Sequence, residues 1–196
     1  MNLILLDINS WPEVFKMNAF NPDTYCGIYC GACSIAMRNS TGHADEFAAC
    51  LKSVPNEELA CGGCKSDTIY AGCSTCSLRR CAREKNIEHC IDCDDFPCKS
   101  YSAWQTAAKF LPHAREAASS LKVIKDSGVD YWLNAQKKRW SCPECGTPFS
   151  WYASVCHNCG GSLISKAHSL SAWRKILCRL VLNIAYRKGK AKNKNV

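Results

Sequence analysis

Cysteine is the residue type on which most of the chemistry of this sequence depends. The chain has 17 cysteines among its 196 residues. Six pairs have two residues between their members, and they begin at Cys30, Cys61, Cys73, Cys90, Cys142 and Cys156. Two cysteines at this spacing can direct both sulfurs at one metal ion from a tight turn. The spacing therefore favours metal binding.

A disulfide framework is the alternative use of so many cysteines, and the start of the chain argues against it. Residues 3–6 are apolar, but no basic residue precedes them and Asp7 follows at once. This is neither the pattern of a secretory signal nor that of a spanning helix. We therefore expect a cytoplasmic protein with no transmembrane segment. Thiols in that reducing compartment bind metal or do redox chemistry rather than form structural disulfides.

The clearest motif lies near the C-terminus. Cys142-Pro-Glu-Cys145-Gly146 and Cys156-His-Asn-Cys159-Gly160 are two knuckles separated by a spacer. The glycine after each second cysteine permits the left-handed backbone that turns amide groups toward the sulfurs. Four sulfurs in a tetrahedron suit zinc, with iron as the alternative.

These knuckles predict a zinc ribbon. The four expected ligands are Cys142, Cys145, Cys156 and Cys159. Because that set is complete, we expect His157 to be a surface residue. Three aromatic residues of the spacer suit a short hairpin, and they are Phe149, Trp151 and Tyr152.

The first half of the chain holds twelve further cysteines, a number equal to three sets of four. They are Cys26, Cys30, Cys33, Cys50, Cys61, Cys64, Cys73, Cys76, Cys81, Cys90, Cys93 and Cys98. The sequence leaves their grouping open. One arrangement makes a single site of Cys30, Cys33, Cys61 and Cys64.

The later cysteines of this region repeat one spacing. Cys73-x2-Cys76-x4-Cys81 is followed by Cys90-x2-Cys93-x4-Cys98, which indicates two interleaved sites with Cys26 and Cys50 available to complete them. Cys50 has an equally good interpretation as a buried core thiol. Cys178, outside this region, is expected to be a core or interface thiol.

Zinc at several sites is the expected cofactor, and an iron–sulfur cluster within residues 26–98 is the alternative. Three clustered cysteines and a remote fourth also hold four-iron clusters. The order Pro97-Cys98, however, reverses the Cys-Pro pair that closes bacterial ferredoxin motifs. A redox protein or an enzyme with a reactive thiol accompanies this alternative.

Catalytic signatures are absent from the sequence. His89 precedes Cys90 and a neighbouring histidine can activate a thiol, but metal-type spacing makes ligation the favoured role of Cys90. Phosphate loops, dinucleotide glycine motifs and paired carboxylates are also missing. We assign no catalytic residue, and an enzyme is not favoured.

Charge divides the chain into two unequal parts. The formal net charge is +8, but residues 137–196 contain twelve Lys and Arg and a single acid, Glu144. A zinc ion with four thiolates has a net charge of −2, so metal makes the first part still more acidic. The basic C-terminal region suits an acidic partner such as nucleic acid or a ribosome.

Hydrophobic periodicity predicts helices at 44–54, 76–86, 99–111, 113–126, 129–139 and 169–187. The last is amphipathic, and either membrane-surface contact or packing on the helical block explains its apolar stripe equally well. A basic disordered tail is expected at 188–196.

The expected fold is a small, irregular, metal-stabilised α+β structure with short helices, zinc knuckles and a ribbon hairpin. Its segments are a lead-in at 1–24, a cysteine-rich domain at 25–111, a helical connector at 112–139, the ribbon at 140–165, and the amphipathic helix with its tail at 166–196.

The order of the cysteine motifs resembles a bacterial and archaeal family, domain of unknown function 3795 (DUF3795). The resemblance covers about residues 25–111 and rests on Cys26-Gly-Ile-Tyr-Cys30-Gly-Ala-Cys33, Cys61-Gly-Gly-Cys64, Cys73-Ser-Thr-Cys76, His89-Cys90-Ile-Asp-Cys93 and Phe96-Pro97-Cys98. It implies a cytoplasmic metal-binding protein, with zinc as the expected metal, and no established activity. The downstream ribbon is similar to an extension of some members. Cys50 falls on no motif of the family.

Overall fold

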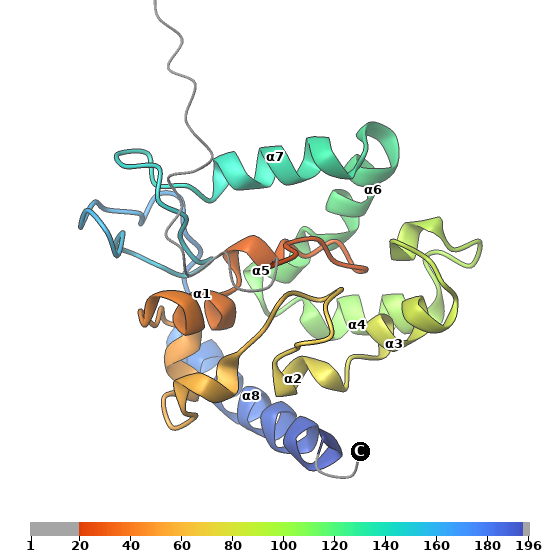
Figure 1. Ribbon diagram of the computed structural model, residues 1–196, viewed down its shortest axis with the longest axis horizontal. Coiled ribbons are helices and arrows are strands. Elements are labelled where there is room, and N and C mark those ends of the chain that lie inside the picture. Colours follow the sequence, from red (N-terminus) through yellow and green to blue (C-terminus); the bar gives the residue numbers. More distant parts are fainter. Residues whose placement is uncertain (1–19, 194–196) are drawn as a thin grey trace, which may run out of the picture.

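The computed structural model describes residues 20–193, and helices are the regular structure of this part of the chain (Figure 1). The α-helices are α1 (Ser34–Thr41), α2 (Ala71–Ser74), α3 (Ser77–Glu84), α4 (Lys99–Ala108), α5 (Pro112–Arg115), α6 (Ala117–Ser127), α7 (Val129–Arg139) and α8 (Ala172–Asn193). Four 3-10 helices are η3 (Cys30–Ala32), η4 (Ala48–Leu51), η5 (Asn56–Leu59) and η6 (Cys90–Asp92). Most of the predicted lead-in, residues 1–19, lies outside the described residues.

The expected α+β class and the zinc-ribbon hairpin are wrong. Between residues 20 and 193 the extended pairings are two isolated bridges, Ser141 with Pro148 and Val155 with Ser162, and no strand forms. The aromatic residues of the spacer do not pair with one another across a hairpin. They are buried instead, and Trp151 N donates to Ala32 O at 3.0 Å. Packing on the first half of the chain has replaced hairpin pairing.

Several predicted helices are confirmed with shifted ends. The prediction at 129–139 coincides with α7, and those at 76–86 and 99–111 contain α3 and α4. The region 113–126 divides at Glu116 into α5 and α6. Pro112 occupies the first turn of α5, where a missing N–H is tolerated.

Other helix predictions fail. Only η4 forms within 44–54, where Asp45 Oδ1 accepts hydrogen bonds from Phe47 N and Ala48 N and so fixes the start of a short turn. The expected disordered tail is wrong for residues 188–193, which continue α8, while 194–196 lie outside the described residues. Helix α1 was not predicted, since its apolar residues are few.

One hydrophobic core joins the two ends of the described chain. Its fully buried members include Leu51 and Leu59 from the first half and Phe149, Tyr152 and Leu163 from the second. A second core lies under α6 and α7 and contains Leu78, Tyr101, Leu121 and Trp132. The cysteine-rich part and the segment that follows α7 are therefore packed together.

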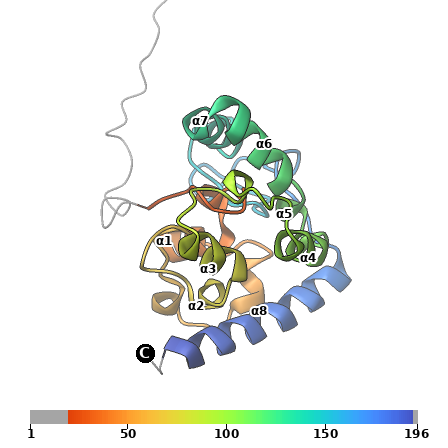
Figure 2. The ribbon, with the colours of Figure 1, turned by 90° about the vertical axis from the view of Figure 1, so that its right-hand side faces the viewer.

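Helix α8 lies along the edge of the molecule opposite α7 (Figures 1 and 2). It approaches α2 so closely that a Cβ on Gly189 would lie 1.7 Å from Ala71 O, which explains the glycine there. Polar contacts fix the same face of the helix, including Lys175 Nζ to Glu46 Oε1 at 2.9 Å. Among the described residues, no helix combines the length and apolarity needed to cross a membrane.

His113 connects α5 to this shared core. Its ring stacks on Trp151 with centroids 3.9 Å apart, and Nδ1 lies 2.7 Å from Tyr152 Oη. Burial, assisted by the nearby His168, lowers the pKa of His113 to about 3. The imidazole is therefore neutral in the folded protein at neutral pH.

This low pKa predicts a loss of stability in acid. Below pH 6.5, its ordinary pKa, His113 binds a proton in the unfolded chain but not in the folded chain. The contribution of neutral His113 to the free energy of unfolding is therefore fully present above pH 6.5. It falls as the pH drops from 6.5 toward 3, by at most about 1.4 kcal/mol per pH unit. Urea unfolding of the wild type and His113→Phe across this range should give a shallower pH dependence for the variant. Parallel curves would contradict the assignment.

Candidate metal centres

Four cysteines near the C-terminus come together as the sequence predicts. The sulfurs of Cys142, Cys145, Cys156 and Cys159 all lie within 4.8 Å of one another, and we call this set the four-cysteine site. Two sulfur pairs across the knuckles, 142 with 159 and 145 with 156, are each 3.7 Å apart. A tetrahedron with zinc–sulfur bonds of about 2.3 Å has edges of about 3.8 Å. The spacing fits a single ion of this size.

Two equivalent turns build the four-cysteine site. Cys142 N donates to Thr147 O at 2.9 Å, and Cys156 N donates to Gly161 O at 2.8 Å. Gly146 and Gly160 have φ of 73° and 75°, the left-handed conformation expected from their positions. The knuckles thus form without strands on either side.

The first knuckle favours the ligand form of cysteine. Hydrogen bonds with the Thr147 hydroxyl and backbone lower the pKa of Cys145 to about 6. Although a backbone hydrogen bond opposes it, the contact with Cys145 and the other two sulfurs raises the pKa of Cys159. Thiolate is the form that coordinates metal, so the turn prepares the exposed Cys145 for binding. Cys142 and Cys156 are buried and attach the site to the core.

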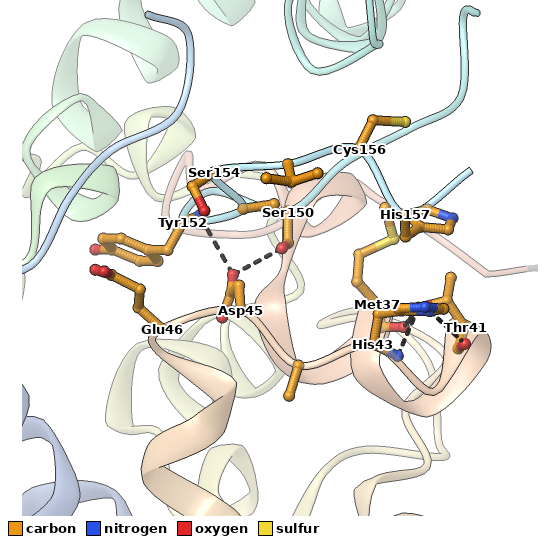
Figure 3. Close-up of a pocket in the computed structure, with 13 residues that line it drawn as sticks. Met37, Thr41, His43, Asp45, Glu46, Ser150, Tyr152, Ser154, Cys156 and His157 are labelled. Carbon is orange, nitrogen blue, oxygen red and sulfur yellow. Dashed lines mark hydrogen bonds between the residues drawn. The ribbon is translucent and has the colours of Figure 1, made fainter. Parts of the chain in front are cut away.

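Asp45 connects the four-cysteine site to the first half of the chain (Figure 3). Its Oδ2 accepts hydrogen bonds from Ser34 Oγ at 2.6 Å, Ser150 Oγ at 2.7 Å and Tyr152 N at 3.3 Å. Since Oδ1 also accepts two backbone N–H groups that follow in the chain, both carboxylate oxygens are saturated. One side chain thereby fixes the spacer between the knuckles against α1.

Seven cysteines of the first half line one cavity of about 240 Å³, which we call the cysteine chamber. They are Cys26, Cys30, Cys33, Cys61, Cys64, Cys73 and Cys76. Within residues 20–193, only the four-cysteine site places three or more metal-binding atoms all within 4.8 Å of one another. The chamber sulfurs are therefore spread around a space rather than closed on a point.

Helix starts deliver several of these sulfurs. Cys33 is the N-cap of α1, Cys76 that of α3 and Cys98 that of α4, and Cys98 Sγ accepts a hydrogen bond from Tyr101 N at 3.5 Å. The positive end of a helix dipole favours an anionic sulfur. The position of Cys33 at a helix start could not be inferred from the cysteine spacing, because α1 was not predicted.

The chamber sulfurs interact electrostatically. Burial, and then the proximity of Cys33, Cys64, Cys73 and Cys61, raise the pKa of Cys30 well above its usual value. Metal ions compete with protons for such thiols, so binding would release protons. Without metal the Cys30 thiol is neutral at physiological pH.

A second, smaller cavity adjoins the chamber. It has a volume of about 30 Å³ and contains the four cysteines Cys81, Cys90, Cys93 and Cys98. Cys90 couples the two cavities, because its pKa is raised by burial and then by sulfurs of both, Cys98 and Cys81 on one side and Cys76 and Cys64 on the other. The predicted set Cys30, Cys33, Cys61 and Cys64 lies wholly in the chamber.

The His89 side chain takes part in a buried ionic network and does not contact the Cys90 sulfur through it. His89 Nε2 lies 3.0 Å from Asp23 Oδ2, and Nδ1 lies 3.6 Å from Asp92 Oδ2. Lys65 Nζ lies 2.7 Å from the same Asp23 oxygen. Although burial opposes it, hydrogen bonds from His89 and Lys65 hold the pKa of Asp23 below its usual value. Both imidazole nitrogens face carboxylates, so His89 is not positioned to activate the Cys90 thiol.

Two cysteines, Cys50 and Cys178, belong neither to a cavity nor to the four-cysteine site. Cys50 Sγ contacts Glu46 O and Lys175 O at 3.6 Å and belongs to the shared core, as Cys178 does. Burial raises the pKa of both thiols. The structure thus places Cys50 as a core thiol.

A family comparison covers the cysteine-rich first half of the chain. Residues 23–103 match the family model described as protein of unknown function, DUF3795. All eleven cysteines of the chamber and the smaller cavity fall within the matched residues, while the four-cysteine site lies outside them. No curated protein and no solved structure matches the chain.

The site includes residues that sequence reasoning missed. Asp45 precedes an apolar run and so carries a weak capping signal, but its partners Ser34 and Ser150 are distant in sequence. Asp23 stands before Thr24 in a segment without periodicity, and only the fold brings it to His89.

Replacing Asp45 should loosen the four-cysteine site. Asp45→Ala leaves Ser34 and Ser150 without their shared acceptor, and we expect a loss of about 2–3 kcal/mol in urea unfolding. The exposed Asp126→Ala is the matched control, with an expected change within about 0.5 kcal/mol. Equal stability of the two variants would contradict the role of Asp45.

Proposed function

We propose that this protein is a zinc-stabilised binding module that attaches to an anionic membrane surface through α8. The sulfur spacing of 3.7 Å in the four-cysteine site is the observation that supports zinc. A site closed by four protein ligands suits a structural ion rather than a catalytic one, which keeps an open position.

Zinc at this site would stabilise the segment that leads into α8. The four-cysteine site precedes a stretch whose Leu163 and Leu170 are buried in the shared core. Leu170 N donates to Glu46 Oε2 at 3.1 Å just before α8 begins. Metal binding at the four-cysteine site therefore stabilises the presentation of α8 as well as the knuckles.

Zinc is tested by removing ligands that contribute little to packing. Cys145 and Cys159 are exposed, so the double variant Cys145→Ser/Cys159→Ser should lose about one zinc per chain by elemental analysis and unfold at lower temperature. Cys50→Ala removes a thiol outside both cavities and the four-cysteine site, and should retain the wild-type zinc content. Unchanged zinc in the double variant, or iron in place of zinc, would refute this assignment.

The outward face of α8 carries an apolar stripe. Trp173 is 57% exposed, Ile176 74%, Leu180 61% and Ile184 45%. These residues recur at three- and four-residue steps, whereas Cys178 and Gly189 face the body of the protein. Packing on the helical block, one of the two interpretations of the sequence, therefore does not explain the stripe.

Cations surround the stripe. Arg179, Arg187 and Lys188 are exposed, and residues 166–193 contain no acid. Within the described residues no carboxylate forms an ion pair with these three side chains. An apolar stripe bordered by cations suits the boundary between lipid headgroups and acyl chains, and each cation contributes about 1 kcal/mol at an anionic surface. Nucleic acid, the other acidic partner considered, offers phosphates but nothing equivalent for the stripe.

Binding to lipid vesicles tests this surface. Full-length protein should sediment with vesicles that contain phosphatidylserine and bind less to vesicles of phosphatidylcholine alone. Ile176→Ser/Leu180→Ser should reduce binding at least about tenfold, because two exposed apolar side chains leave the stripe. Ile164→Ser is the matched control, since Ile164 is also 74% exposed but lies outside α8.

Two outcomes would overturn the membrane proposal. Equal vesicle binding by the double variant and by Ile164→Ser would show that the stripe is not the contact. Salt-dependent binding to RNA or DNA without vesicle binding would replace lipid by nucleic acid as the partner.

A further inference from the structure

The cysteine chamber is too large for one ion. One water molecule needs about 10–15 Å³ of such space, and the chamber offers about 240 Å³. The smaller cavity, by contrast, has about 30 Å³ among its four cysteines. The two cavities therefore suit occupants of different size.

Sulfur spacing distinguishes the chamber from the four-cysteine site in the same way. No three ligand atoms of the chamber lie within 4.8 Å of one another, whereas the four-cysteine site closes to 3.7 Å. A polynuclear iron–sulfur cluster holds its cysteine sulfurs farther apart than one zinc ion does, because irons and sulfides stand between them. The open arrangement of sulfurs matches a cluster.

An unsatisfied hydroxyl also faces this region. Tyr70 lines the chamber and is 3% exposed, and within the described residues its Oη has no hydrogen-bond partner. A buried hydroxyl without a partner is costly. Cluster sulfurs accept hydrogen bonds, and such bonds help to set the reduction potential.

A fixed cation stands at the chamber wall. Arg79 lines the cavity, and its guanidinium donates from Nε to Cys64 O at 2.8 Å and from Nη2 to Ser66 O at 2.9 Å. Four thiolates around a cluster carry negative charge into this cavity. Arg79 offsets part of that charge from a position determined by the backbone.

We propose that the cysteine chamber binds an iron–sulfur cluster, with Cys30, Cys33, Cys61 and Cys73 as its ligands and Tyr70 Oη as a hydrogen-bond donor to it. All four line the chamber. Cys30 is near enough to the other three for their charges to raise its pKa, and Cys33 and Cys61 act on Cys73 in the same way. The proposed ligands lie within the matched residues 23–103, and the proposal goes beyond the zinc and membrane functions.

Anaerobic purification of the full chain tests the proposal directly. We expect iron and acid-labile sulfide in equal amounts, about four of each per chain for a cubane cluster, and visible absorption that dithionite bleaches. Zinc at the four-cysteine site should accompany them. Zinc without sulfide, both as purified and after anaerobic reconstitution with ferrous iron and sulfide, would overturn the proposal while leaving the zinc and vesicle experiments unaffected.

Variants locate the cluster within the chamber. Cys30→Ser/Cys73→Ser should abolish bound sulfide, and Cys50→Ala should retain it. Tyr70→Phe keeps all sulfurs, so it should retain full iron and sulfide while shifting the reduction potential to a more negative value through loss of one hydrogen bond. Sulfide that persists in the double cysteine variant, or an unchanged potential in Tyr70→Phe, would refute the corresponding assignment.

Discussion

The Asp45 carboxylate is the contact on which the joining of the two halves depends. It satisfies two backbone N–H groups before η4, the Ser34 hydroxyl at the start of α1, and two donors of the spacer between the knuckles. Five donors converge on one short side chain that has no freedom to reach elsewhere. The segment that Asp45 holds contains Trp151 and Tyr152, and both of these aromatic residues belong to the shared core.

Thiolate charge is the second constraint on the fold. Cysteines from separate segments of the chain line common cavities, and Cys33, Cys76 and Cys98 cap the starts of helices α1, α3 and α4. Burial raises the pKa of Cys30 well above its usual value, so without metal this thiol keeps its proton. A metal bound by sulfurs from separate segments would hold those segments together. Metal coordination and folding are consequently expected to be one process rather than two.

Spacing in the sequence predicts local features well and distant ones badly. The knuckles, their left-handed glycines and α7 follow from a few neighbouring residues, and all were anticipated. The hairpin failed because Trp151 and Tyr152 bind to the first half of the chain, a preference invisible to local pattern. The chamber likewise gathers Cys30, Cys61 and Cys73 from three separate segments of the chain, so twelve cysteines could be counted but not grouped. Asp45 and Asp23 acquire their roles only from partners far along the chain.

The close approach of Gly189 to Ala71 holds one face of α8 against the body of the protein and leaves the other face exposed. Its outward face meets solvent, while Leu182 and Ala185 on its inward side line the chamber and Tyr186 stacks on Tyr70. One rigid element therefore forms part of both surfaces. By thermodynamic linkage, whatever free energy the chamber's occupant contributes to the position of α8 must appear equally in the affinity of its outer face for a partner. A change in the occupancy or oxidation state of the group in the chamber would therefore change the affinity of the outer face of α8 for its partner.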